Sequence, residues 1–246
     1  MSNCRICYFC QLLNQGDLSS LVSAKLSLIF EYQKVRQSMN ATFLYEVIEL
    51  EERSNEFLRC FFEELSVDPY IEGSYRRRAY SRYHLKSSKV ERRPHRPFQQ
   101  GYENKLFAVV SRNYPPLELK IDLIPAFYHL LDEFAKRTRI DPNKDFIDVH
   151  QIRIVCGSDC NALPAPEGIH QDGFRFVGIY CVQRQNVDGG FTEIYSEPNG
   201  EALIHSILQE NQCIILNDKR FYHYASAIIS HDIHKIGSRD VFVLTT

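Results

Sequence analysis

The chain has 246 residues, of which 44% are hydrophobic, and a formal net charge of −2. This length and apolar content suffice for a continuous core, in one large domain or two small ones. The nearly balanced charge gives no overall attraction to nucleic acid or anionic lipid, and no apolar run approaches the roughly 18 residues of a membrane span. We therefore expect no nucleic-acid partner and no membrane segment.

Cysteine usage indicates a reducing environment. The chain has eight cysteines, but it is too long to need disulfide staples, and its start lacks the pattern of a secretory signal peptide. We expect reduced thiols and a cytoplasmic location. Four cysteines lie in apolar stretches and are expected to behave as small buried hydrophobes, namely Cys60, Cys156, Cys181 and Cys213.

The N-terminal segment differs from the rest of the chain. A C-x-x-C-x-x-C run over residues 4–10 has a spacing that can bind zinc or an iron–sulfur cluster, but a fourth ligand at a usual spacing is missing. Met39 is a possible alternative start. We therefore interpret residues 1–38 as an appendage of uncertain status and residues 39–246 as a single domain.

The first half of this domain predicts helices around one strand. Apolar residues at helical spacing among glutamates predict a helix over residues 45–66. Residues 74–83 mix aromatic residues with arginines and predict a strand with one wet face. The polar, proline-bearing residues 85–102 predict a loop. A second apolar stripe predicts a helix over residues 124–136, with a proline tolerated in its first turn.

From residue 148 onward, short runs rich in valine, isoleucine, phenylalanine and tyrosine alternate with turn residues. Many short strands at this spacing favour a sandwich or jelly roll over a parallel sheet with crossover helices. We predict a mainly β fold, a double-stranded β-helix (jelly roll, cupin-like) with flanking helices. The expected strands cover residues 149–156, 174–183, 191–195, 213–216, 222–229 and 239–245.

Two histidines and a carboxylate form a candidate metal site. His170 and Asp172 are two residues apart, so on a strand both side chains project to one side. His223 follows far enough along the chain to return on a neighbouring strand. Two histidines with one carboxylate hold non-haem Fe(II) on one face and leave the opposite face open. The alternative for His223 is a core imidazole, with His231 and His234 as substitutes.

Arg239 begins an apolar run that predicts a further strand. A fixed guanidinium there suits a carboxylate that must be held near the metal. The alternative is a surface ion pair with Asp240.

In these residues the chain resembles the 2-oxoglutarate/Fe(II)-dependent dioxygenases, and within them the bacterial free amino acid hydroxylases of the isoleucine 4-hydroxylase type. The resemblance is strong from about residue 145 to the end. It rests on the segments Val149–Arg153, Pro164–Gly173, Asn186 with Gly189–Thr192, Asn217–Arg220 with His223, and Ser238–Asp240.

The resemblance implies iron bound by His170, Asp172 and His223, with Arg239 pairing the distal carboxylate of 2-oxoglutarate and O2 as the oxidant. Ascorbate is the expected reductant in vitro. The implied activity is hydroxylation of a free, aliphatic L-amino acid, coupled to decarboxylation of 2-oxoglutarate. Two alternatives stay open: the same chemistry on a modified or carrier-bound amino acid or a natural-product intermediate, and a jelly-roll binding protein without turnover.

Other residues are candidate contacts for the small molecules. Gln151 and Arg153 share one face of their expected strand, and Arg153 could take the substrate's α-carboxylate or form a structural salt bridge. Glu167 could meet a substrate ammonium or fix its loop. Thr192 could hydrogen-bond the co-substrate or be an ordinary strand residue.

The chain also carries a basic run between Arg76 and Arg96. A solvated strand edge and loop explains this run, and steering of anionic small molecules is the alternative. A basic rim around an open groove would also suit a carrier-bound substrate. The identity of the amino acid, the carbon oxidised and the oligomeric state do not follow from the sequence.

Overall fold

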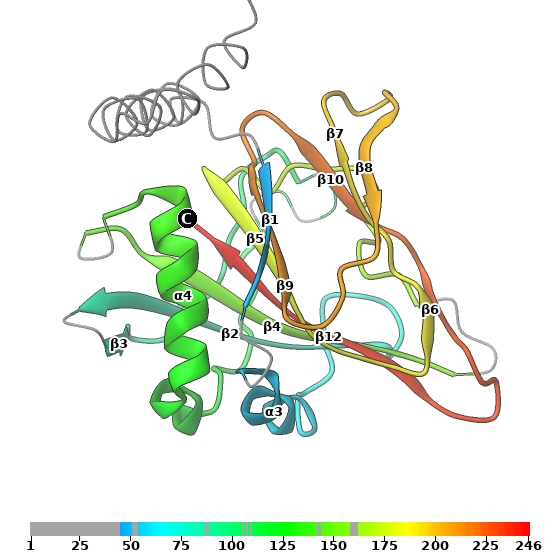
Figure 1. Ribbon diagram of the computed structural model, residues 1–246, viewed down its shortest axis with the longest axis horizontal. Helices are drawn as coiled ribbons and strands as arrows, with labels where there is room; N and C mark the ends of the chain where they lie inside the picture. Colours follow the sequence, from blue (N-terminus) through cyan, green and yellow to red (C-terminus); the bar gives the residue numbers. More distant parts are fainter. Residues whose placement is uncertain are drawn as a thin grey trace, which may run out of the picture. The chain divides into compact units, whose positions relative to one another are not determined.

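The computed structural model describes residues 45–50, 54–86, 89–104, 106, 108, 110–141, 144–157 and 162–246 (Figure 1). All of these belong to one compact unit. The appendage expected over residues 1–38, its C-x-x-C-x-x-C run and the boundary at residue 39 lie outside the described residues.

A seven-stranded sheet in which every neighbouring pair is antiparallel forms the larger layer. Such a sheet suits strands with one face against a core and the other against helices. Its strands in spatial order are β1 (Tyr45–Glu49), β9 (Gln212–Asn217), β5 (Phe176–Gln185), β12 (Gly237–Thr245), β4 (Ile147–Cys156), β2 (Arg76–Lys86) and β3 (Lys89–Arg92).

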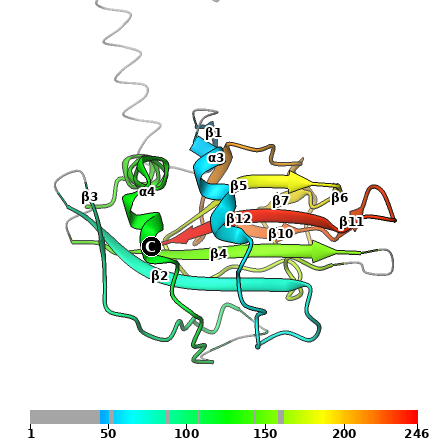
Figure 2. The ribbon, with the colours of Figure 1, turned by 90° about the horizontal axis from the view of Figure 1, so that it is seen from below.

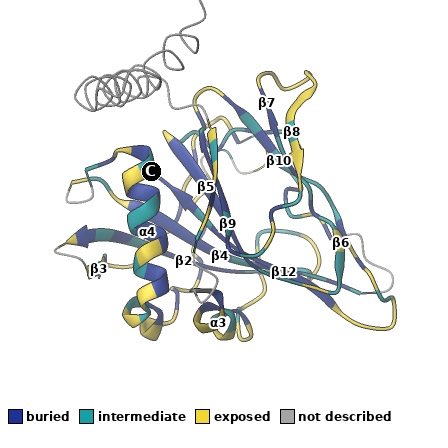
Figure 3. Cartoon of the chain, in the orientation of Figure 1, coloured by how far each residue is buried: buried dark blue, intermediate teal, exposed yellow. Residues whose placement is uncertain are grey.

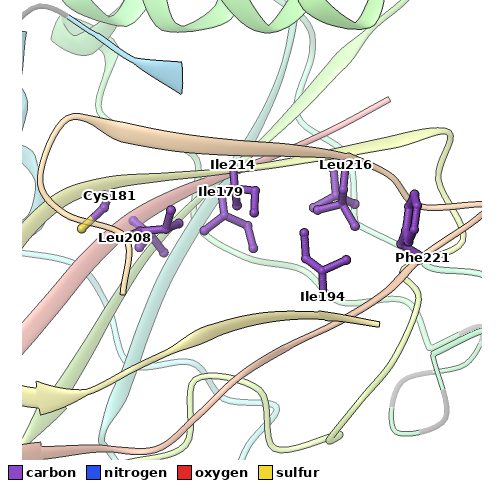
Figure 4. Close-up of a cluster of buried hydrophobic side chains, with 9 residues drawn as sticks. Ile179, Cys181, Ile194, Leu208, Ile214, Leu216 and Phe221 are labelled. Atoms are coloured by element: carbon purple, nitrogen blue, oxygen red, sulfur yellow. The ribbon is translucent and has the colours of Figure 1, made fainter. Parts of the chain in front are cut away.

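Shorter strands form the second layer, on the other side of the large sheet from the helices (Figure 1). They are β10 (Tyr222–Ala225), β7 (Thr192–Tyr195) and β8 (Ala202–Ser206) in one sheet, and β11 (Ile228–Ser230) and β6 (Val187–Gly189) in another. A buried apolar cluster joins Ile179 and Val241 of the large sheet to Ile194 of β7 (Figure 4). The predicted mainly β jelly roll is confirmed.

Helices cover the outer face of the large sheet (Figure 2). The main one, α4 (Pro125–Thr138), begins at a proline, which fits the first turn, and ends where Arg139 adopts a left-handed conformation. Its side toward the sheet is buried and its other side is exposed (Figure 3). Phe127 packs against Phe242 of β12, and burial of such a side chain stabilises the fold by about 1.5–3 kcal/mol. The smaller helices are α3 (Ser54–Arg59), η2 (Cys60–Phe62) and η3 (Leu119–Leu123).

The structure corrects several expectations about local elements. Residues 45–49 form β1 at the sheet edge, and the helix predicted over 45–66 is confined to α3 and η2. Within the predicted loop 85–102, β2 ends and β3 pairs back onto it. The single strand expected over 222–229 is two short strands in different sheets. In each case the pairing partner is distant in sequence, so local periodicity cannot identify it.

The cysteines were mostly placed correctly. Cys156, Cys181 and Cys213 are buried and free, as expected, whereas Cys60 is exposed because it lies at the start of the surface element η2.

The register of the large sheet decides which side chains meet the second layer. Arg76 of β2 is opposite Ile154 of β4, which in turn is opposite Arg239 of β12. Arg78, two residues further along β2, projects to the same side of the sheet as Arg76 and lies in the neighbouring cross-strand row of inward-facing side chains. Because side chains alternate along a strand, the residues between these face the helices instead.

Candidate active site

His170, Asp172 and His223 converge between the two layers. Their potential ligand atoms all lie within 4.8 Å of one another. The Nε2 atom of His170 is 3.5 Å from one carboxylate oxygen of Asp172, and Nε2 of His223 is 3.6 Å from the other. The two histidines also exchange backbone hydrogen bonds of 3.1 and 2.9 Å. No side chain of the three is more than 11% exposed.

The side chain of Asp218 fixes the loop that carries Asp172. Its carboxylate accepts hydrogen bonds from the three consecutive backbone N–H groups of residues 172–174, at 2.8–3.1 Å. One of its oxygens also lies 3.6 Å from Nδ1 of His223. A carboxylate behind a ligating imidazole is the usual means of orienting the ring. Asp218 therefore fixes the loop that carries Asp172 and lies beside the ring of His223, whose Nδ1 has no hydrogen-bond partner in the described chain.

The ring of His170 is oriented by its own loop. Its Nδ1 lies 2.8 Å from the carbonyl oxygen of Gly168, a distance at which an Nδ1–H donates to that oxygen. Gly168 has a φ of +77°, a conformation that favours glycine. Because Nδ1 is occupied in this way, Nε2 is the nitrogen directed toward the other two ligands.

The protonation of the triad is set by burial and by the close approach of its members. Burial opposes the charged form of His170, but the carboxylate of Asp172 raises the pKa of this imidazole to about 9. Burial, and then the charge of His170, lowers the pKa of His223 to about 3. Burial would raise the pKa of Asp172, yet the nearby imidazoles hold it well below its usual range. A metal ion bound here would displace the proton of His170, because only a neutral imidazole coordinates.

Two residues that the sequence did not suggest position the carboxylate of Asp172. The amide nitrogen of Gln100 donates a hydrogen bond to Asp172, and the guanidinium of Arg112 donates one to the amide oxygen of Gln100. Both are buried. They lie in a segment with few regular elements, where spacing carries no signal.

Arg239 lies on β12 with 2% of its surface exposed, so a surface ion pair is excluded. Its Nε and Nη2 atoms have no hydrogen-bond partner among the described residues. These two N–H groups form one edge of the guanidinium, the edge that binds a carboxylate through two parallel hydrogen bonds. Burial lowers the pKa of Arg239. A Cβ added to the neighbouring Gly190 would lie 3.3 Å from Cδ of Arg239, so glycine leaves room for this side chain.

One pocket connects Arg239 to the triad. It contains about 720 Å³ of space free of atoms, which includes open solvent. Aliphatic side chains form much of its wall, namely Ile152, Ile154, Ile179, Val241 and Val243. Its charged side chains are Arg76, Arg78, Arg112, Glu167 and Asp172, besides Arg239.

Arg153 and Gln151 are on the outer face of the sheet and do not line this pocket. Arg153 forms ion pairs with Asp240 at 2.7 Å and Glu63 at 2.9 Å, and the amide of Gln151 donates to the backbone oxygen of Phe61. The expected contact of these two residues with substrate is therefore wrong. The alternative of a structural salt bridge is what Arg153 makes.

Glu167 lines the pocket, whereas Thr192 lies next to it. Glu167 lines the pocket, with one oxygen 3.4 Å from Nε2 of His170 and the other without a hydrogen-bond partner in the described chain. Thr192 is 1% exposed on β7, and its hydroxyl also has no partner there. Its backbone pairs with Ala225, which lines the pocket, so Thr192 is adjacent to the pocket rather than in its wall.

Part of the basic run is neutralised within the fold. Its arginines form ion pairs as follows: Arg76 with Asp68, Arg82 with Asp148, Arg92 with Asp122, and Arg93 with Glu91. Four arginines of the run thus form ion pairs within the fold. Neither interpretation of the run, a solvated edge or a steering surface, predicted these pairs. His231 and His234, the substitutes considered for His223, lie on the surface away from the triad.

A two-layered antiparallel fold with two histidines and a carboxylate at one end of its pocket defines a jelly-roll metal site. Residues 59–245, most of the chain, match the 2OG-Fe dioxygenase family. The chain therefore belongs to this family and is a 2-oxoglutarate-dependent dioxygenase that uses Fe(II), 2-oxoglutarate and O2. No curated protein matches the chain significantly.

Similar crystal structures agree with this fold. A bsmA homologue from Methylobium petroleophilum PM1 is 24% identical, with a TM-score of 0.71, over 85% of this chain and 90% of that one. IDO from Bacillus thuringiensis is 16% identical, with a TM-score of 0.68, over 85% and 91%. The Fe(II)/α-ketoglutarate-dependent dioxygenase TqaL is 16% identical, with a TM-score of 0.62, over 89% and 87%. Within the described part of the chain, no helix has the length and apolar character to cross a membrane.

The residues present fit the iron and the co-substrate. The triad offers two imidazoles and one carboxylate, the donor set suited to non-haem Fe(II). The unpartnered edge of Arg239 fits a carboxylate inside the same pocket. The pocket thus contains groups that could hold a metal and an organic acid together.

Proposed function

We propose that the protein is a hydroxylase of a free, aliphatic L-amino acid, with iron held by His170, Asp172 and His223. The observation that carries this proposal is one pocket that holds a 2-His-1-carboxylate set, an unpartnered guanidinium and an aliphatic wall. Bound iron, 2-oxoglutarate and O2 supply a reaction in which R–H, 2-oxoglutarate and O2 yield R–OH, succinate and CO2.

The protein's contribution to this reaction is to bind and orient. Arg239 would hold the distal carboxylate of 2-oxoglutarate through its unpartnered edge. Gln100 and Asp218 would keep the ligands in place by their hydrogen bonds to Asp172 and its loop. The isoleucines and valines of the wall would exclude water from the reacting C–H bond.

Glu167 is the proposed receptor for the substrate's ammonium group. It lies beside His170 in the pocket, and one of its oxygens is buried and free of hydrogen bonds within the described chain. A buried carboxylate oxygen without a donor is costly, and an ammonium group would satisfy it. This places the amino group of the substrate near the metal ligands, with the aliphatic side chain along the apolar wall.

Succinate formation tests the proposal. The purified enzyme is incubated with Fe(II), 2-oxoglutarate, ascorbate and each common L-amino acid in turn, and succinate and hydroxylated product are measured. We expect one or a few aliphatic amino acids to raise succinate formation with an equal amount of product. Iron-dependent succinate formation that no amino acid stimulates would contradict the substrate, and its complete absence would contradict the assigned site.

A further inference from the structure

Arg78 is a buried cation that its surroundings do not neutralise. It projects from β2 into the pocket and is 8% exposed. Its Nη2 lies 2.9 Å from Nδ1 of His150, and its Nε has no hydrogen-bond partner among the described residues. Its guanidinium carbon is 4.6 Å from the ring centre of Tyr114 and 5.8 Å from that of Phe98. These contacts favour a guanidinium, but none of them carries a negative charge.

His150 cannot supply a negative charge to Arg78, because an imidazole is either neutral or positively charged. Burial, and then the proximity of Arg78, lowers the pKa of this imidazole well below its usual value. The imidazole is therefore neutral and accepts the hydrogen bond of Arg78 at Nδ1.

The neighbouring arginines on the same face of β2 have carboxylate partners. Arg76 pairs with Asp68 at 2.9 Å, and Arg82 pairs with Asp148 through two nitrogens. Between them, Arg78 has no ion pair among the described residues. A buried unpaired charge costs several kcal/mol, whereas a buried pair recovers much of that cost. Of the two arginines of β2 that line the pocket, Arg76 is thus neutralised by a carboxylate, whereas Arg78 has no ion pair among the described residues.

Arg78 and Arg239 are placed to bind different carboxylates. Both face the pocket from the large sheet, but β4 separates their strands, and they lie one inward-facing row apart. With strands about 4.8 Å apart and a rise of about 3.3 Å per residue, their Cα atoms are separated by roughly 12 Å.

We propose that Arg78 receives a carboxylate of the substrate, so that the substrate is a small molecule with a free carboxylate. This inference rests on the proposed function, because it assigns Arg239 to 2-oxoglutarate and the triad to iron. With Glu167 at the ammonium group, Arg78 completes a site of two opposite charges for a zwitterion. An amino acid tethered to a carrier through its carboxyl group would lack the group that Arg78 binds.

Direct binding tests this assignment without turnover. L-leucine and L-leucinamide are titrated calorimetrically into anaerobic enzyme loaded with Fe(II) and 2-oxoglutarate. The two probes share an aliphatic side chain and an amino group, and they differ in the carboxylate. We expect leucine to bind roughly 10- to 150-fold more tightly than the amide, the range of a charge-assisted hydrogen bond. Equal binding of the two, or binding of neither, would overturn the assignment.

Variants then assign the difference to Arg78. Arg78→Met is expected to bind leucine and leucinamide equally, and Arg78→Lys to retain part of the preference. Arg93→Met, in the same basic run but at the surface, is the matched control and should keep the wild-type preference. An Arg78→Met enzyme that needs more 2-oxoglutarate but still prefers leucine would overturn the proposal. If Arg78→Met does not fold, the wild-type comparison and Arg78→Lys still decide.

Failure of the proposed function has a different signature. Succinate formed from 2-oxoglutarate without substrate reports on the iron and the co-substrate site alone. Its absence in the wild type would contradict the roles of the triad and Arg239. Arg93→Met should keep both this succinate formation and the preference for leucine, whereas loss of that preference in Arg78→Met is the result expected if Arg78 serves the substrate.

Discussion

Replacement of Arg239 by methionine is expected to separate co-substrate binding from stability. The variant removes two buried N–H donors, Nε and Nη2, that have no partner in the described chain and are assigned to the distal carboxylate of 2-oxoglutarate. Each hydrogen bond to a charged group contributes about 1.5–3 kcal/mol, so the pair contributes about 3–6 kcal/mol. This corresponds to an increase of about 10²- to 10⁴-fold in the 2-oxoglutarate concentration required.

Stability should respond in the opposite sense. Because the guanidinium of Arg239 is 2% exposed and unpaired among the described residues, its replacement by an apolar side chain of similar length removes a desolvated charge. We expect the ligand-free variant to unfold at a temperature equal to or above that of the wild type.

The assay is substrate-independent succinate formation as a function of 2-oxoglutarate concentration, with thermal unfolding of the same preparations. Arg175→Met, at an exposed arginine, is the control and should leave both quantities unchanged. Wild-type dependence on 2-oxoglutarate in Arg239→Met would refute the reasoning. A large loss of stability without a change in that dependence would show instead that Arg239 serves the fold.

Three further predictions concern the triad and its surroundings. His223→Ala is expected to abolish stoichiometric Fe(II) binding in anaerobic titration while thermal unfolding stays near wild type; full ferrous uptake would contradict its role. Gln100→Leu removes a donor to Asp172 and should weaken Fe(II) binding about 10- to 100-fold, and unchanged affinity would count against this role. Burial, and then the charge of Arg78, lowers the pKa of His150 well below its unfolded value of about 6.5, so its contribution to stability is present above that pH and is lost as pH falls. Denaturant unfolding at pH 7 and 5 should show this loss reduced in His150→Gln, and equal losses in both proteins would disprove it.

Local patterns predicted those helices and strands whose buried side chains recur at a regular spacing along the chain. The stripe on α4 and the apolar runs of β4, β5, β9 and β12 have the spacing of their element, so the sequence identified them. β1 did not follow its local pattern. Its residues lie among glutamates at helical spacing, yet they pair with β9, more than 160 residues further along the chain. Such pairing is a tertiary interaction and overrides a weak local preference.

The same division holds for the site. The triad was predictable because two ligands lie two residues apart in the sequence and the third has a characteristic place in the chain order. The two do not share a strand: His170 forms an isolated bridge with His223, and Asp172 lies in the loop that follows. Gln100 and Arg112 were not predictable, because their contact with Asp172 depends on how a segment with little regular structure packs against the pocket.

The arginines show most directly what the sequence determines and what the tertiary structure decides. Alternation along a strand fixes that Arg153 and His150 project to opposite sides, because the period of a strand is two. It does not say which side meets the second layer. Only the packing of helices on one face and short strands on the other turns Arg153 toward Asp240 and leaves Arg78 and Arg239 in the pocket. Burial free energy depends on what covers each face, and that is a property of the assembled sheet rather than of any one strand.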